Sequence, residues 1–288
     1  MKRTEIRHCT RYLFGAPVVL GPHLLRLRPR EGHDLRIASS TLEIVPTAVL
    51  TWRRDLYDNV LGVATFGGAT YRELVIESRL VVELYETMPL NFVVEDHAVH
   101  FPFGYRPEEQ TALHPYMDPV YPDHPRLTDW LSAFQQVPDG TETFAILDRM
   151  NQRIHSDLRY EVREEAGVLA PDETLRLGAG SCRDMAALFL ESCRRLGIAA
   201  RFVSGYVHGP ATEYGGASSH AWAEVYLPGA GWKGFDPTNG SVVGPDHIPV
   251  AVHHHPEAIP PVAGSFTGDK DAAVSLQVDV QIVEIPDA

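Results

Sequence analysis

The sequence of 288 residues contains only three cysteines, Cys9, Cys182 and Cys193. They are too few and too unevenly spaced for a disulfide framework. If Cys182 and Cys193 share a helix, about 16 Å separates them at 1.5 Å per residue, which is too far for a disulfide bond. We therefore expect reduced thiols in a cytoplasmic protein.

Long apolar runs and positive charge are also scarce. No stretch approaches the roughly 18 uninterrupted apolar residues that span a bilayer. The first residues, MKRTEIRHCTRYLF, lack the apolar segment of a secretory signal. A formal net charge of −13 opposes non-specific binding to nucleic acid or to an anionic membrane. We expect neither kind of partner.

Familiar metal and phosphate motifs are missing as well. The sequence has no HExxH or CxxC motif, and neither of the glycine-rich phosphate-binding patterns. The run His253–His255 lies in a proline-flanked loop, where three consecutive side chains point in different directions. We expect no metal and no cofactor. A zinc hydrolase built on this run remains an alternative, and it predicts roughly one zinc per chain by elemental analysis.

The order of local patterns indicates an α+β protein. Residues 1–100 are rich in Val, Ile, Leu, Thr and Tyr with partial alternation, which predicts an antiparallel β-sandwich or small barrel. Residues 101–288 form the second predicted domain, a helix packed on an antiparallel sheet. Its expected elements are helices at 126–136, 139–161 and 182–196 and strands at 200–209, 218–228 and 231–240. The chain from 241 is loop-like until a final strand near 274–285, and the pattern does not show which sheet that strand joins.

Cys182 stands directly after the glycine-rich turn LGAGS and opens an apolar helical run. A thiol is mostly protonated at neutral pH, but a helix N-terminus and an imidazole can stabilise its thiolate. The backbone N–H of Cys182 would also be a natural donor to an oxyanion. Cys193 falls in the apolar stripe and is predicted to be core. Asp184 is predicted to interact with the N–H groups of the first helical turn.

The partners that a nucleophilic cysteine needs lie downstream. His220 opens one predicted strand, and Asp236 ends the next, with the turn PGAG between them. Adjacent antiparallel strands would bring the two side chains together. An aspartate on one ring nitrogen fixes the tautomer and leaves the other nitrogen for the thiol. Together they form a candidate Cys-His-Asp triad.

Three segments, GAGSCRDMAALFLESCRRLGIAARFVSGYV, SSHAWAEVYLPGAGWKGFDPTNG and DHIPVAVHHHPEAIPPVAGSFTG, resemble the bacterial transglutaminase-like proteins of the papain-like superfamily. CTRYLFGAPVVLGPHLLRLRPR and RRDLYDNVLGVATF resemble the β-rich N-terminal region of that family. The resemblance implies a papain-like core in which Cys182 is the nucleophile, His220 the base and Asp236 the orienting acid.

Two departures from the family pattern are visible. Members often carry Gly-Arg-Asp where this chain has His253–His255, a run that we expect near the rim of the site. The oxyanion glutamine of papain-type proteases has no counterpart before Cys182, and Tyr160 is the candidate for that role. The remaining candidates for the oxyanion site or the substrate cleft are Ser181, Ser219 and Trp222. For Trp222, core packing is an equal alternative, and for Ser219 a local turn is favoured.

These residues predict acyl transfer through a thioester, on a protein or peptide substrate. Water as acceptor would make the chain a protease or amidase, and an amine would make it a transglutaminase; both remain open. The alternative from another class is a catalytically silent module that binds peptides on the same fold. The oligomeric state is also left open.

Overall fold

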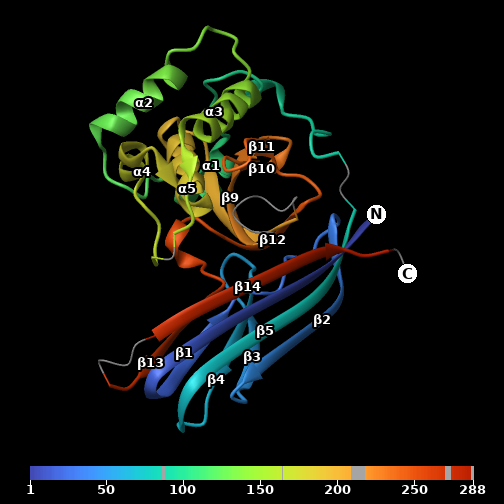
Figure 1. Cartoon of the computed structure of the whole chain (residues 1–288). Coiled ribbons are helices and arrows are strands. Elements are labelled where there is room, and N and C mark those ends of the chain that lie inside the picture. Colours follow the sequence, from blue (N-terminus) through green and yellow to red (C-terminus); the bar gives the residue numbers. More distant parts are fainter. Residues whose placement is uncertain (86–87, 164, 209–217, 270–273, 287–288) are drawn as a thin grey trace.

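The computed structural model describes residues 1–85, 88–163, 165–208, 218–269 and 274–286. An elongated β domain lies below a mixed unit of helices and strands, and the two termini lie close together at their junction (Figure 1). The predicted α+β class is confirmed, and both main sheets are antiparallel. No helix in these described ranges combines the length and apolarity needed to cross a bilayer.

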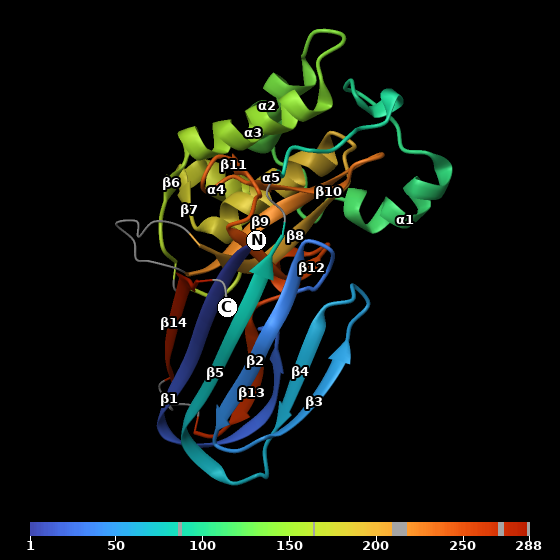
Figure 2. The same cartoon turned by 90° about the vertical axis from the view of Figure 1, so that its right-hand side faces the viewer.

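The β domain is one seven-stranded sheet in the order β2-β5-β1-β4-β3, with β13 and β14 also paired to β1. Strand β1 is long enough to serve both layers of the domain. Its first half pairs with β5 and β14, and its second half pairs with β4 and β13. Figure 2 shows the resulting two layers of strands. The predicted sandwich is therefore a single sheet folded over itself. Its strands are β1 (Lys2–Leu25), β2 (Leu35–Val45), β3 (Val49–Arg54), β4 (Val60–Thr65), β5 (Thr70–Leu84), β13 (Val262–Thr267) and β14 (Val274–Glu284).

The last two strands correct the predicted domain boundary. The expected division placed all of 101–288 in the second domain, yet β13 and β14 belong to the N-terminal sheet. Strand β14 pairs with β1 from Thr4↔Glu284 to Phe14↔Val274. Its alternating pattern predicts a strand but not a partner, because the partner lies at the other end of the chain. The second unit therefore ends before β13.

The upper unit is built around a five-stranded sheet in the order β11-β10-β9-β8-β12. Helix α5 (Cys182–Arg195) packs on it and is buried from Asp184 to Arg194. Its strands are β8 (Ala200–Val207), β9 (Ser218–Leu227), β10 (Gly231–Asp236), β11 (Ser241–Val242) and β12 (His247–His253). The other helices are α1 (Pro107–Met117), α2 (Pro125–Gln135), α3 (Thr143–Asp157), α4 (Pro171–Leu177) and the short 3₁₀ turns η1 (Asp96–Ala98) and η2 (Pro256–Ala258). The three predicted helices and three predicted strands are confirmed within a few residues.

Strand β12 differs from the expectation that the chain after 241 is loop. It pairs with β8 at the edge of the sheet, with a bulge between Pro249 and Ala251. A proline has no N–H to donate, so it is tolerated on an edge strand and obscures the strand in the sequence. Helix α4 begins at Pro171, which occupies the first turn, where no intrahelical donor is needed.

The two parts share an apolar core at their junction. Ile6 and Leu80 of the β domain lie in one buried cluster with Tyr206 and Ile248 of the upper sheet. The Tyr206 hydroxyl also contacts Nδ1 of buried His8 at 3.0 Å. The β domain therefore packs directly against β8 and β12, two strands next to the candidate site.

Candidate active site

Helix α5 begins at the candidate nucleophile. Ser181 precedes it, and the Ser181 N–H and hydroxyl donate to Asp184 Oδ2 at 2.9 and 2.7 Å. The predicted role of Asp184 at the first helical turn is thus confirmed. These bonds satisfy polar groups at the start of the helix. They therefore fix the first turn of α5, which begins at Cys182.

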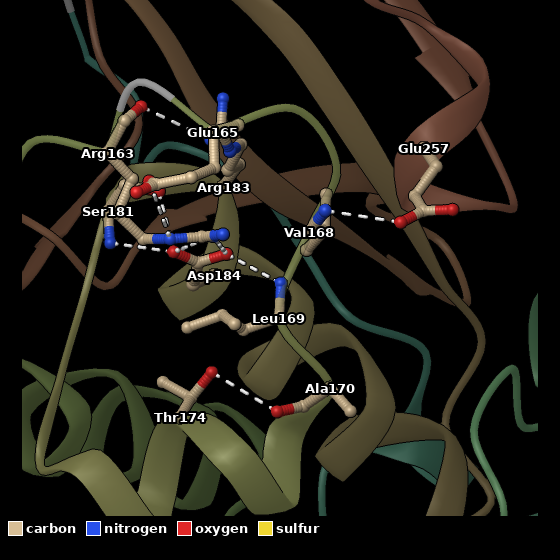
Figure 3. A network of polar contacts seen from close by, with 10 residues as sticks. All are labelled: Arg163, Glu165, Val168, Leu169, Ala170, Thr174, Ser181, Arg183, Asp184 and Glu257. Carbon is tan, nitrogen blue, oxygen red and sulfur yellow. Dashed lines mark hydrogen bonds and ion pairs between the residues drawn. The ribbon is translucent and has the colours of Figure 1, made fainter.

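The same carboxylate ties down the neighbouring loop (Figure 3). Asp184 Oδ1 accepts from Arg163 Nη1 at 2.8 Å and from the Leu169 N–H at 2.8 Å. Arg183 donates to the carbonyl of Arg163 at 3.2 Å and to that of Glu165. Asp184 is fully buried, so this ion pair is shielded from water. The loop beside the candidate nucleophile is therefore fixed to its helix.

The glycine-rich turn before Cys182 places Tyr160 near the site. Gly178 ends α4 in the left-handed conformation, at φ 61°. The next residues, β7 (Ala179–Gly180), pair in parallel with β6 (Arg159–Tyr160). Burial, followed by the charges of Cys182 and Asp236, raises the pKa of Tyr160 to about 12. Its hydroxyl is therefore protonated at neutral pH and can donate a hydrogen bond.

His220 and Asp236 meet across the predicted hairpin. In the β9–β10 register Phe235 pairs with Ala223, so Asp236 lies diagonally across from His220 on the same face. His220 Nε2 lies 2.8 Å from Asp236 Oδ2. A carboxylate can only accept, so Nε2 is the donor and Nδ1 is left for the thiol. Cys182 lines the same cleft as this imidazole and is close enough to raise the pKa of His220.

Asp236 is fully buried and surrounded by donors, including one that the sequence analysis missed. Its Oδ2 accepts from His220, from Asn239 Nδ2 at 2.6 Å and from His247 Nε2 at 3.0 Å. Its Oδ1 accepts from the backbone N–H groups of Thr238 and Asn239 at 3.0 and 3.3 Å. His247 lies in DHIPV, part of a segment that resembles the family, but nothing local links it to Asp236.

These contacts shift both members of the pair towards their charged forms. Burial opposes the imidazolium, but the Asp236 carboxylate and the Cys182 thiol outweigh it and raise the pKa of His220 to about 10. Burial likewise opposes the carboxylate, but His220 and His247 hold the pKa of Asp236 well below its usual range. At neutral pH the pair is imidazolium and carboxylate.

Cys182 and His220 line one cleft. Its other lining residues come from three directions: the loop at Gly167 and Val168, the strands β8 and β9, and the segment that follows β12. They are Gly167, Val168, Arg183, Phe202, Ser204, Ser219, Ala221, Pro256, Glu257, Ile259, Pro260 and Pro261. Glu257 Oε1 accepts from the Val168 N–H at 3.2 Å, joining two of these walls (Figure 3). Most of the lining is apolar, which suits an uncharged carboxamide or peptide.

The three remaining cleft candidates, Ser181, Ser219 and Trp222, lie in different surroundings. Ser219 lines the cleft with His220. Trp222 is fully buried among Val203 and Val252, which corresponds to the core alternative. The Ser181 hydroxyl is turned onto Asp184. The alternation along the strand correctly predicted that Trp222 lies on the same face as His220. How deeply a side chain on that face is buried depends on the elements that pack over it.

The other two cysteines are distinct from Cys182. Cys193 is fully buried in the main core, as predicted, and burial raises the pKa of its thiol. Cys9 is half-buried in β1 of the β domain.

His253 and His254 contact Tyr57 of the β domain. The ring of Tyr57 packs on His253 with centroids 4.3 Å apart, and the Tyr57 hydroxyl contacts His254 Nδ1. His255 Nδ1 accepts from the Glu257 N–H at 3.2 Å. The run His253–His255 directly precedes Pro256 and Glu257, which line the cleft. It therefore connects the cleft wall to the β domain without lining the cleft itself. Within the described residues, no cluster of three His, Cys, Asp or Glu side chains could hold a metal ion.

The chain matches two family models, and a solved structure similar to it covers its whole length. Residues 133–237 match the transglutaminase-like superfamily profile, and residues 4–83 match the bacterial transglutaminase-like N-terminal region. The crystal structure of a candidate cysteine protease from Cytophaga hutchinsonii covers 100% of this chain and 92% of its own, with a TM-score of 0.76 at 16% sequence identity. That similarity shows the fold.

Several curated relatives are uncharacterized proteins from mycobacteria. One from Mycobacterium leprae is 25% identical over 292 residues, covering 99% of this chain and 100% of the relative. One from Mycobacterium tuberculosis is 30% identical over 145 residues, and the match spans 47% of this chain and 46% of that relative's length. The core profile contains Cys182, His220 and Asp236, and the second profile covers most of the β domain. The chain belongs to the bacterial transglutaminase-like family, with the N-terminal region of that family followed by a transglutaminase-like core.

Proposed function

We propose that the chain is an enzyme that transfers or hydrolyses acyl groups at a peptide or carboxamide bond, through a thioester on Cys182. The observation that carries this proposal is the placement of Cys182 and His220 in one cleft, with His220 Nε2 2.8 Å from a buried Asp236. A thiol, an imidazole and a carboxylate in this order are the parts of an activated cysteine nucleophile.

The first half-reaction forms the thioester. An imidazolium beside the sulfur, together with the N-terminus of α5, favours the thiolate of Cys182. The thiolate attacks the carbonyl carbon, and the Cys182 N–H stabilises the oxyanion, with the Tyr160 hydroxyl as the proposed second donor. The imidazolium of His220 then gives its proton to the nitrogen of the departing amine. The C–N bond breaks and a C–S bond remains.

The second half-reaction needs a base, and His220 is now neutral. It takes a proton from water or from a primary amine as that acceptor attacks the thioester. Asp236 stabilises the imidazolium that forms again. The released thiolate closes the cycle. Water yields a carboxylic acid and an amine yields a new amide, so the acceptor decides between amidase and transglutaminase chemistry.

Alkylation tests the nucleophile without a known substrate. At neutral pH, iodoacetamide should label Cys182 at least about tenfold faster than Cys9, and His220→Ala should abolish that difference. Cys193 should react slowest because it is buried. Labelling of Cys182 at the rate of an ordinary thiol would support the catalytically silent module instead.

A substrate panel tests the reaction. Glutamine-containing and other peptides, with and without a primary amine, are incubated with the wild type and with Cys182→Ala. Cys9→Ala is the matched control, because it removes a thiol far from the cleft. Release of ammonia or cleavage in the wild type and Cys9→Ala, but not in Cys182→Ala, is expected. Turnover that survives Cys182→Ala would refute the thioester.

A further inference from the structure

His247 is a second histidine on the carboxylate of the candidate triad. It is the first residue of β12, and its side chain is 7% exposed. Its Nε2 lies 3.0 Å from Asp236 Oδ2, the same oxygen that His220 contacts. The two imidazole centroids are 6.4 Å apart. One buried oxygen is therefore shared by two rings from different strands.

The orientation of His247 is determined on its other sides. Its Nδ1 accepts from the Gly244 N–H at 3.3 Å, which assigns the remaining proton to Nε2 in the neutral ring. The ring also makes a T-shaped contact with buried Trp222, with centroids 5.3 Å apart and planes at 80°. His247 is absent from the cleft lining, so it does not touch the reacting atoms.

We propose that His247 is a positioning residue of the active site, which acts by donating from Nε2 to Asp236 Oδ2 and so fixes and moderates the carboxylate that orients His220. This inference rests on the proposed function of Cys182, His220 and Asp236. Without the second imidazole, Asp236 Oδ2 keeps His220 and Asn239 Nδ2 as donors but loses one of its three. The Asp236 carboxylate then stabilises the His220 imidazolium more strongly, because one of the donors that partly neutralise it is gone.

Few titratable groups lie near His247, His220 and Asp236. The titratable groups that act on His220 and Asp236 are Cys182 of α5, Tyr160 of β6 and His247 itself. The residue before His247, Asp246, is paired with Lys2 of β1. His208, at the end of β8, lies near the same carboxylate. In the described residues, the direct ionic partners of Asp236 are His220 and His247.

Three substitutions separate the proposed role from a packing role. His247→Gln can present an amide N–H near the position of Nε2, His247→Asn is one bond too short, and His247→Ala has no donor. Each is compared with the wild type and with His114→Ala, a change at an exposed histidine on α1. The measurement is the rate of Cys182 alkylation by iodoacetamide from pH 5 to 11, with thermal unfolding as a check on folding.

We expect the wild type, His114→Ala and His247→Gln to agree within about threefold. His247→Ala and His247→Asn should react at least about tenfold more slowly at neutral pH, since a misplaced base is costly. In these two variants, the change in alkylation rate that accompanies loss of the His220 proton at alkaline pH should also move to higher pH. The reason is that an Asp236 carboxylate with one donor fewer holds the His220 proton more tightly.

The proposal is overturned if His247→Ala matches the wild type, or if Gln and Asn behave alike with no movement of this alkaline change in rate. If His247→Ala does not fold, the comparison of Gln with Asn decides. Failure of the proposed function has another signature: Cys182 of the wild type itself would then react no faster than Cys9.

Discussion

Asn59, at the tip of the β3–β4 hairpin, binds the backbone of Val252 in β12 through both ends of its carboxamide. The Val252 N–H donates to Asn59 Oδ1 at 2.8 Å, and Asn59 Nδ2 donates to the Val252 carbonyl at 2.9 Å. Asn59 is fully buried and also accepts from Arg30 at 2.9 Å. The side chain imitates a neighbouring strand. The β domain thereby holds β12, the strand that begins at His247 and leads into the cleft wall.

Replacing Asn59 should therefore loosen the active site as well as the junction. Asn59→Leu leaves two backbone groups of Val252 without partners in a buried position, and we expect a loss of about 3 kcal/mol in unfolding free energy. Cys182 alkylation should slow in the same variant. Asp58→Asn, at an exposed position in the same turn, is the control and should change neither. Urea unfolding checks the first effect; equal stability of the two variants would contradict it.

Acid should destabilise the protein through His8. Burial lowers the pKa of His8 to about 4, below the ordinary value of 6.5. Between these values the unfolded chain binds a proton that the folded chain does not, so stability is lost as pH falls from 6.5 towards 4. The contribution is on the order of 3 kcal/mol.

The matching experiment measures unfolding free energy at pH 7, 5.5 and 4.5 for the wild type, His8→Gln and the exposed control His33→Gln. The glutamine at position 8 keeps a neutral hydrogen-bonding group beside Tyr206 but removes the titration. Its pH dependence should be flatter than that of the other two proteins. Three parallel curves would rule out this role of His8.

Gly205 of β8 leaves room for the Trp222 ring of β9 and for the Ile248 carbonyl of β12. A side chain should therefore not be tolerated at this position. A Cβ atom there would lie 2.3 Å from the Ile248 carbonyl oxygen and 2.7 Å from the Trp222 ring. Gly205→Ala should cost about 2 kcal/mol of unfolding free energy through overpacking. Gly67→Ala, where nothing lies within 4 Å, is the control. Because Gly205 pairs with His220, slower Cys182 alkylation should accompany the loss. Equal unfolding midpoints for the two variants would refute the packing argument.

Asp184 should be a larger determinant of stability than any exposed ion pair. Asp184→Ala leaves the Arg163 guanidinium, which is 18% exposed, with only the exposed carboxylate of Glu165 at 3.9 Å. Breaking such a buried pair should cost about 3 kcal/mol or more. Glu173→Ala, which removes an exposed partner of Arg176 on α4, is the control and should leave the thermal midpoint nearly unchanged. A comparable loss in both variants would show that the Asp184 network carries little stability.

Local pattern was enough to predict the parts of the candidate site that are close in sequence. Cys182 at the start of a helix follows from a glycine-rich turn before an apolar stripe. His220 and Asp236, 16 positions apart, follow from one hairpin whose turn sets the strand pairing. The same reasoning left Trp222 open between the cleft wall and the core, since alternation assigns a face of the sheet and not a depth beneath the surface.

The sequence by itself determined the class of fold, the nucleophile helix and the histidine–aspartate hairpin, because each depends on short-range periodicity, capping or a single turn. Tertiary structure alone decided that β14 joins the N-terminal sheet, that Asn59 holds Val252 across 193 positions, and that His247 reaches Asp236. Such contacts join segments that no local rule connects. They form because burying the junction leaves these polar groups no water to bind, so they must bind one another.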